Sequence, residues 1–163
     1  MSETQQTELK SLLELIREIE IGLLTTLDGE HRLHTRPVQT LRCDANGVLW
    51  FFTDVGSSKA EEMRSDARVS IGYAHLATGR YAAVEGRARI GRDRGKAAEL
   101  WSPLQRAWYP QGLDDPRLAV LEVHIERAEY WITPGRASYA VAATQAALTG
   151  VPATVGEDVK LSR

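Results

Sequence analysis

Apolar and polar positions near the N-terminus follow a helical period. Apolar residues recur three or four positions apart with charged residues between them, namely at Leu9, Leu12, Leu13, Ile16 and Ile19. Ser2 followed by Gln5 offers a capping box at the start of this segment. The pattern predicts an amphipathic helix over about residues 3–20, with one face packed against the rest of the protein.

The pattern beyond this helix is typical of strands joined by tight turns. Strand-forming residues fill Ile21–Leu27, His31–Cys43, Val48–Thr53, Arg68–His75, Arg80–Ile90 and Arg117–Ile132. Asp28-Gly29 and Asn46-Gly47 are turn dipeptides, and Gly86 predicts a bend within its strand. Short helices are predicted over Ser57–Ser65, Lys96–Trp101 and Ala140–Leu148, the last of them ended by Gly150.

This order of elements predicts a mainly β (α+β) fold. Helices do not alternate strictly with strands, so a doubly wound parallel sheet is disfavoured and a small antiparallel barrel with peripheral helices is favoured. The 163 residues fit one domain, 1–163, with a helical C-terminal extension over about 138–163. Pro37 cannot donate to a ladder, so its strand is expected at an edge or a bulge.

Composition excludes several classes of function. A net charge of −2 does not suggest nucleic acid as a main partner. No apolar run approaches the roughly 20 residues of a membrane span, and the first residues do not form a secretory signal. The single cysteine, Cys43, fits a reducing cytoplasm, and a structural strand residue is favoured over a redox-active thiol. His31 and His34 would point to opposite faces of a strand, so no metal site is expected.

The stretch "FFTDVGSSKAEEM" (residues 51–63) places small hydroxyl residues and a lysine where a strand passes into a helix. A helix N-terminus presents unpaired amides and a partial positive charge. Ser57 and Ser58 add hydroxyl donors there, and Lys59 adds a full positive charge. A cation in this position is unfavourable by roughly 0.3–1 kcal/mol unless an anion is nearby. The stretch predicts either a phosphate cradle or a capped surface helix, and it does not match the P-loop pattern.

A second candidate segment is "HTRPVQT" (residues 34–40). Arg36 supplies a planar charged fork that suits a phosphate, and Pro37 interrupts the ladder. Backbone groups of residues 38–40 would then be available to a ligand, although an edge strand with an exposed arginine has the same pattern. Trp101, Trp108 and Tyr109 lie in a connection broken by proline and glycine, where they could contact a ligand or pack in the core.

The order of these sequence segments along the chain resembles that of the FMN-binding split-barrel superfamily related to pyridoxamine 5'-phosphate oxidase. The resemblance is strongest to its general stress protein subgroup. The segments that carry the resemblance lie between about Ile16 and Leu148 and read "GLLTT", "TRPVQT", "LWFFTDVGSSKAEEM", "RVSIGYA", "YAAVEGRARI", "ELWSPLQRAWYPQG", "DDPRLAVLEV" and "RAEYWI". The resemblance implies an antiparallel split β-barrel of Greek-key type, and a homodimer with FMN sites at the subunit interface.

The resemblance also implies roles for individual residues. The phosphate and ribityl end of FMN would be held by Arg36, Ser57, Ser58 and Lys59. The isoalloxazine ring would lie beside Pro37, Val38, Gln39 and Thr40, in a pocket also lined by Phe52 and Thr53. Trp108 and Trp131 would approach from the second subunit. Tyr81 replaces a glutamine of the oxidase, so its contact with FMN is not assigned.

The oxidase carries a C-terminal Arg-Leu-His type motif for its phosphorylated substrate, and "YWITPGRASYAVAATQAALTG" lacks it. Pyridoxamine 5'-phosphate oxidase activity is therefore not expected, and this tail is expected to pack over the barrel. The leading hypothesis is a stress-related FMN-dependent oxidoreductase of unknown small-molecule substrate, with FAD less favoured than FMN. The alternatives are a non-catalytic flavin store or redox sensor, and a protein that binds a deazaflavin or haem. No catalytic residue is predicted.

Overall fold

The structure is a computed structural model that describes residues 2–133, 136–152 and 156–162. Its strands are β1 Ile21–Leu27, β2 Leu33–Gln39, β3 Arg42–Asp44, β4 Val48–Asp54, β5 Arg68–His75, β6 Arg80–Gly91, β7 Leu118–Ile132 and β8 Glu157–Ser162. Its helices are α1 Glu3–Ile19, α2 Ser58–Ser65, α3 Arg94–Leu100 and α4 Arg136–Thr149, with short 3₁₀ helices η1 Pro103–Ala107 and η2 Gly112–Asp114.

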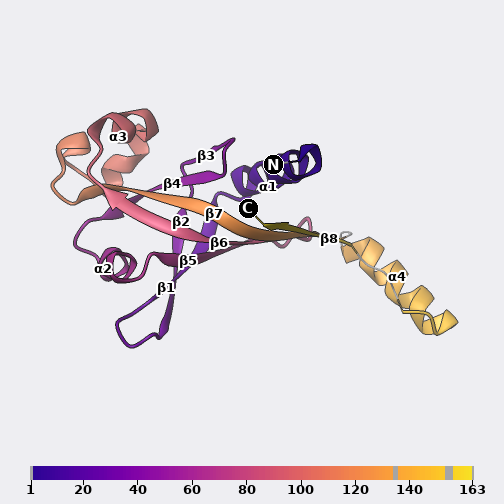
Figure 1. The fold of residues 1–163 in the computed structure, drawn as a ribbon. Coiled ribbons are helices and arrows are strands. Elements are labelled where there is room, and N and C mark those ends of the chain that lie inside the picture. The colour runs from indigo at the N-terminus through magenta and orange to yellow at the C-terminus, as the bar shows by residue number, and fades with distance from the viewer. Residues whose placement is uncertain (1, 134–135, 153–155, 163) are drawn as a thin grey trace.

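The strands form one antiparallel sheet that curls on itself (Figure 1). Along the sheet the order is β2-β1-β5-β6-β7-β4-β3, and β8 adds to β7. β2 and β4 approach each other without a ladder between them in the described residues, so the barrel is split at this place. The mainly β fold is confirmed, and β2, which contains Pro37, is an edge strand as predicted.

The N-terminal helix is built as its sequence predicts. The Ser2 hydroxyl accepts a hydrogen bond from the Gln5 amide, and the Gln5 side chain accepts one from the Ser2 amide. The apolar stripe of α1 is buried in the main core together with residues from the interior of the barrel, such as Leu24, Phe51 and Ile71. Burial of this stripe attaches α1 to the barrel.

A second, smaller core lies on the outer side of β4 and β7. There Leu100, Tyr109, Leu118 and Val120 are buried and Phe52 packs against them. The Phe52 ring lies 6.1 Å from the Tyr109 ring in an edge-to-face arrangement. This cluster fixes the connection that contains η1 and η2 beside β4.

The predicted continuous strand over His31–Cys43 is wrong. The chain forms β2, leaves the ladder at Thr40, and begins β3 at Arg42. The Thr40 amide donates to the Glu20 carbonyl at 2.8 Å, and the Leu41 amide donates to the Trp50 carbonyl at 2.8 Å. These two hydrogen bonds fix the connection between β2, which pairs with β1, and β3, which pairs with β4. The chain crosses the split of the barrel through this connection.

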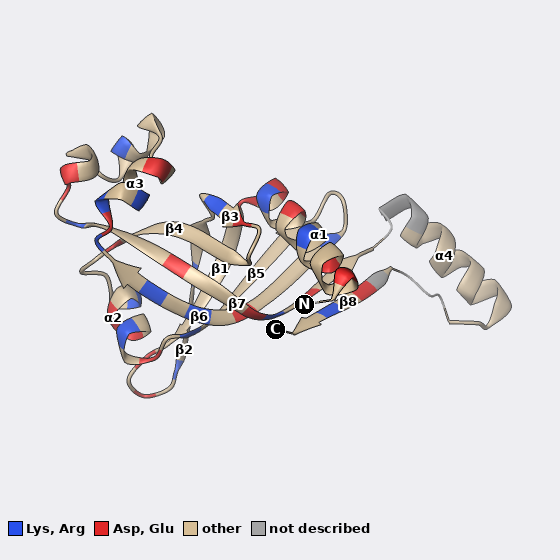
Figure 2. Ribbon diagram, turned by 45° about the horizontal axis from the view of Figure 1, so that its top comes forward, with Lys and Arg blue, Asp and Glu red and all other residues tan. Residues whose placement is uncertain are grey.

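The predicted helical extension over about 138–163 is wrong in its second half. α4 ends at Thr149, and β8 then pairs antiparallel with β7. The alternation of Val159 and Leu161 with charged residues is a strand pattern, and Leu161 is buried in the main core. α4 stands away from the barrel instead of packing over it, and its described side chains, residues 139–149, include no charged residue (Figures 1 and 2).

Candidate functional site

A cavity of about 400 Å³ lies at the split of the barrel, between β2, β4 and η1. This volume lies in the range of small-molecule sites in proteins. The residues that line it are Ile21, Pro37, Val38, Gln39, Leu41, Phe52, Lys59, Gln105, Trp108 and Tyr109. The fold therefore brings together one half of the predicted site residues from three separate segments of the sequence, and Trp108 lies in the cavity of its own chain.

The start of α2 combines both alternatives considered for its sequence. The Ser57 hydroxyl accepts a hydrogen bond from the Ala60 amide at 3.4 Å and donates one to the Asp54 carbonyl at 2.7 Å, so Ser57 caps the helix. Ser58 is exposed at the first helical position. The amides of Ser58 and Lys59 have no acceptor within the helix, because they belong to its first turn. A capping side chain and first-turn amides without helical acceptors therefore coexist here.

Lys59 is a half-buried cation at the edge of the cavity. Burial lowers the pKa of Lys59, the positive charge of Arg36 lowers it further, and Asp54 acts in the opposite direction. Within the part of the chain that the structure describes, no carboxylate is close enough to form an ion pair with its amino group. A partly desolvated cation without an ion pair would be stabilised by a bound anion.

Arg36 extends from β2 toward α2. Its Nη1 group donates to the Thr26 hydroxyl and, at 2.9 Å, to the His34 carbonyl, while its Nη2 group donates to Glu62 Oε2 at 2.6 Å. A guanidinium has five N–H donors, so these three bonds leave the Nε–H and one Nη2–H. The two remaining donors lie on the same edge of the guanidinium, which is a geometry that suits a phosphate.

Glu62 holds these groups together and was not predicted as a site residue. It is 8% exposed, and its carboxylate also contacts His34 Nδ1 at 2.8 Å and the Thr26 hydroxyl. Burial raises the pKa of Glu62, but hydrogen bonds from Thr26, Arg36 and His34 outweigh it and lower the pKa to about 2. Local sequence offers one signal, since Glu62 lies between Ala60 and Met63 on the buried side of α2.

Other predicted residues lie outside the cavity. Thr53 follows Phe52 on β4 and therefore faces the opposite side of the strand, where it is buried and its hydroxyl has no partner among the described residues. The Thr40 hydroxyl bonds to the Tyr73 hydroxyl at 2.8 Å. Trp131 pairs with Tyr81 in the ladder near the end of β7 that lies far from β4. These positions do not contribute to the cavity of one chain.

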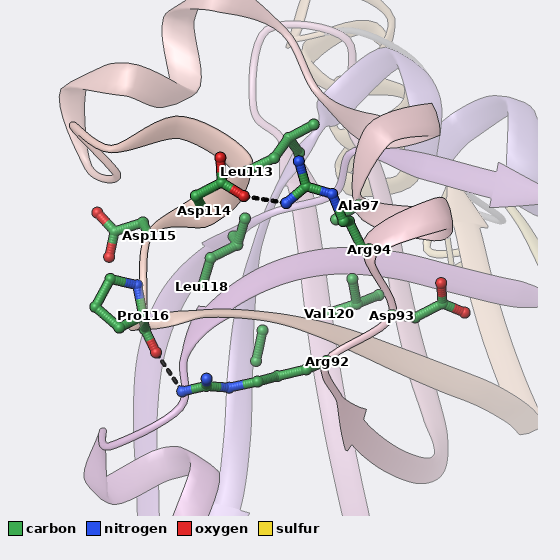
Figure 3. A pocket seen from close by; sticks show the side chains of 11 residues that line it. Arg92, Asp93, Arg94, Ala97, Leu113, Asp114, Asp115, Pro116, Leu118 and Val120 are labelled. Atoms are coloured by element: carbon green, nitrogen blue, oxygen red, sulfur yellow. Dashed lines mark hydrogen bonds and ion pairs between the residues drawn. The ribbon is translucent and has the colours of Figure 1, made fainter.

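Another hollow, of about 250 Å³, lies beside α3 (Figure 3). Its charged groups have partners within the chain. Arg94 pairs with Asp114, Arg92 donates to the Pro116 carbonyl, and Asp93 caps α3 by accepting from the Lys96 amide at 2.9 Å. Because these contacts satisfy its charges, this hollow lacks the unpartnered cation that distinguishes the cavity at the split.

The remaining chemistry of the chain does not suggest a separate centre. The described residues contain no group of three His, Cys, Asp or Glu side chains that could hold a metal ion. Cys43 is buried on β3, and burial raises the pKa of its thiol to about 11, which opposes thiolate chemistry. The structural interpretation of Cys43 is therefore supported.

Comparison with known families shows which family the chain matches. The family described as "Pyridoxamine 5'-phosphate oxidase like" matches residues 7–153. The chain is also similar to protein bli-3 of Neurospora crassa, with 30% identity over 149 residues that cover 85% of this chain and 71% of that protein.

Solved structures share the fold. A candidate general stress protein 26 from Jannaschia sp. CCS1 superposes with a TM-score of 0.74 at 24% identity, covering 97% of this chain and 99% of that one. The general stress FMN/FAD binding protein from Xanthomonas citri superposes with a TM-score of 0.67 at 26% identity, covering 77% of this chain and 89% of that one. The likeness to the first shows the split-barrel fold.

Proposed function

This chain belongs to the pyridoxamine 5'-phosphate oxidase-like family, and from that premise we propose that it binds FMN in the cavity at the split of the barrel. The observation that carries the proposal is the half-buried Lys59, which borders the cavity and forms no ion pair among the described residues. The similar protein from Xanthomonas citri, described as FMN/FAD binding, supports a flavin as the ligand.

The phosphate of FMN would lie at the start of α2. Lys59 supplies a full positive charge, Arg36 supplies its unused Nε edge, and the first amides of α2 supply further donors. A terminal phosphate dianion matches this concentration of positive charge better than the bridging, singly charged phosphates of FAD. This argument favours FMN over FAD.

The isoalloxazine ring would lie along the outer edge of β2. In the described residues this edge has no ladder partner, so its backbone groups beside Pro37, Val38 and Gln39 can reach a polar ring. Phe52 and Trp108 supply apolar surface across the cavity. When bound, FMN would supply electron or hydride transfer, while these residues bind and orient it.

We infer a flavin-dependent oxidoreductase, with a flavin store or redox sensor as the second candidate. The second candidate is favoured by the side chains around the cavity, among which only Lys59 and Tyr109 titrate. Burial raises the pKa of Tyr109 to about 12, so its hydroxyl is not suited to proton transfer near neutral pH. The general stress relatives support a stress-related role for either candidate.

The proposal is tested by the absorption spectrum of the purified protein and by titration of the apoprotein with FMN. We expect a flavin spectrum, release of FMN on denaturation as identified by mass spectrometry, and saturable rebinding. A colourless protein that does not bind added FMN would refute it. If a particular acceptor reoxidises the reduced holoprotein faster than it reoxidises free reduced FMN, that result would favour the enzyme over the flavin store.

We also propose a homodimer whose interface borders the cavity. Ile21 and Leu23 on β1 are 52% and 54% exposed, and they face the same side as Pro37 and Gln39 on β2. Ile21, Pro37 and Gln39 also line the cavity, so a second copy on this apolar face would cover its mouth. Trp131, which lies far from the cavity of its own chain, would then be available to the site of the second copy.

Light scattering should give about twice the 18.1 kDa mass of one chain. Leu23→Lys places a charge on the apolar face and should shift the protein toward monomer, since a buried unpaired charge opposes association. Leu104→Lys is the matched control, because Leu104 is 77% exposed and lies on η1, not on β1 or β2. A monomeric wild-type protein with FMN bound would contradict the proposal.

A further inference from the structure

Glu62 presents a physical problem at an anion site. It is a buried carboxylate on the same helix as Lys59, and its low pKa keeps it charged at neutral pH. Such a charge repels a phosphate bound at the start of α2. A negative charge retained at this place therefore needs a role that offsets the repulsion.

The hydrogen bonds around Glu62 indicate that role. Thr26 contacts Glu62 Oε2 and also receives the Nη1 bond of Arg36, so the two acceptors lie side by side at the Nη1–Nη2 end of the guanidinium. His34 Nδ1 lies 2.8 Å from the other carboxylate oxygen and fixes the rotation of the carboxylate. The arrangement holds the guanidinium by one end and leaves its Nε edge without a partner in the described residues.

We propose that Glu62 is a positioning residue that orients Arg36 so that the Nε edge of the guanidinium faces the phosphate of FMN. The inference rests on the proposed function, because the phosphate belongs to that ligand. Thr26 and His34 hold Glu62, Glu62 holds Arg36, and Arg36 contacts the anion. The planar fork of arginine makes orientation decisive, since two parallel donors bind a phosphate only when the edge is turned toward it.

Two physical accounts of Glu62 predict opposite changes in FMN affinity when its charge is removed. If Glu62 acted only through its charge, its neutralisation would remove a repulsion and tighten the binding of FMN. If Glu62 orients Arg36, the Glu62→Gln substitution weakens the binding of FMN because the guanidinium loses its charged anchor. Glutamine keeps the size of the side chain, so the comparison isolates the carboxylate.

The experiment measures dissociation constants of FMN and of riboflavin, which lacks the phosphate, by fluorescence titration of the apoprotein. We expect Glu62→Gln to weaken FMN binding by roughly tenfold, within the range of coupling between residues in one hydrogen-bond network. Riboflavin binding should stay unchanged. In an Arg36→Ala background, Glu62→Gln should weaken FMN binding no further. Glu61→Gln is the matched control, because Glu61 is the exposed neighbour on α2.

Three outcomes overturn the inference while leaving FMN binding intact. They are an unchanged or tighter FMN affinity in Glu62→Gln, an equal loss of FMN and riboflavin affinity, and the same loss in the Arg36→Ala background. If wild-type protein fails to bind FMN, the proposed function itself fails.

A readout without flavin tests the anchoring of Arg36 by itself, and it also serves if Glu62→Gln does not fold. In the apoprotein, NMR of the Arg36 side chain should show a guanidinium whose rotation is restricted, and Thr26→Val should release it. A guanidinium that rotates freely in the wild-type apoprotein overturns the inference.

Discussion

Lys59→Ala is expected to weaken FMN binding by roughly ten- to a hundredfold. A charge-assisted hydrogen bond contributes about 1.5–3 kcal/mol, and each 1.4 kcal/mol is about a tenfold change in affinity. Lys59 is half-buried at the edge of the cavity, so its attraction for a phosphate is less screened than that of a surface lysine. Titration of the apoprotein with FMN measures the effect.

The same substitution should not destabilise the apoprotein. Burial and the charge of Arg36 lower the pKa of Lys59, which means that the folded state disfavours its positive charge when no anion is bound. Removing that charge relieves an unfavourable interaction, so the thermal midpoint without flavin should stay the same or rise. A lower FMN affinity together with an unchanged or higher thermal midpoint would show that the substitution removes a ligand contact and leaves the fold intact.

Two controls complete this prediction. Lys160→Ala removes an exposed lysine that is paired with Glu129 on β7, and it should change neither FMN affinity nor the thermal midpoint by a measurable amount. Riboflavin should bind Lys59→Ala nearly as well as it binds the wild-type protein. An FMN affinity that is unchanged in Lys59→Ala would mean that the phosphate does not lie at the start of α2.

Features encoded in a continuous stretch of sequence were predictable. The capping box at Ser2 and Gln5, the helix start at Ser57 and the edge position of Pro37 each follow from residues that are neighbours in the chain. Caps and turns depend on side chains that reach only a few residues along the backbone. The sequence therefore indicates the two segments that supply Lys59 and Arg36, but not that they meet in space.

Features that depend on contacts between distant segments were not predictable in the same way. Glu62 resembles any acidic residue of a short helix until β1 and β2 place Thr26 and His34 against it. Phe52 and Thr53 were assigned to one pocket, although the period of a strand sends adjacent side chains to opposite faces. The opposite orientation of Phe52 and Thr53 follows from the alternation rule alone, whereas the contacts of Glu62 depend on the tertiary fold.

Strand boundaries also depend partly on contacts between distant segments of the chain. The break at Thr40 depends on carbonyl acceptors of Glu20 and Trp50, which belong to different segments, so residues 31–43 read as one strand in isolation. The sequence predicts a helical tail where β8 lies, because the short alternation of β8 follows a longer helical pattern. Pairing with β7, which buries Leu161, decides its structure.

Gly86→Ala is expected to lower the free energy of unfolding by about 3 kcal/mol or more, as for overpacking at a site that cannot relax. Gly86 lies at the register shift between β6 and β7, which agrees with the bend predicted there. A Cβ atom at this position would lie 2.1 Å from the backbone carbonyl oxygen of His124. Backbone cannot rotate away as a side chain can, so either the bulge or the ladder must shift.

Gly72→Ala on β5 is the matched control, because a Cβ atom there meets no other atom within 4 Å. Alanine in a strand interior is no worse than glycine, so Gly72→Ala should keep or slightly raise the stability of the protein. Chemical denaturation of both variants would measure the difference. If Gly86→Ala were as stable as the wild-type protein, the bulge could rearrange at little cost. In that case the contact between β6 and β7 would not constrain the barrel at this point.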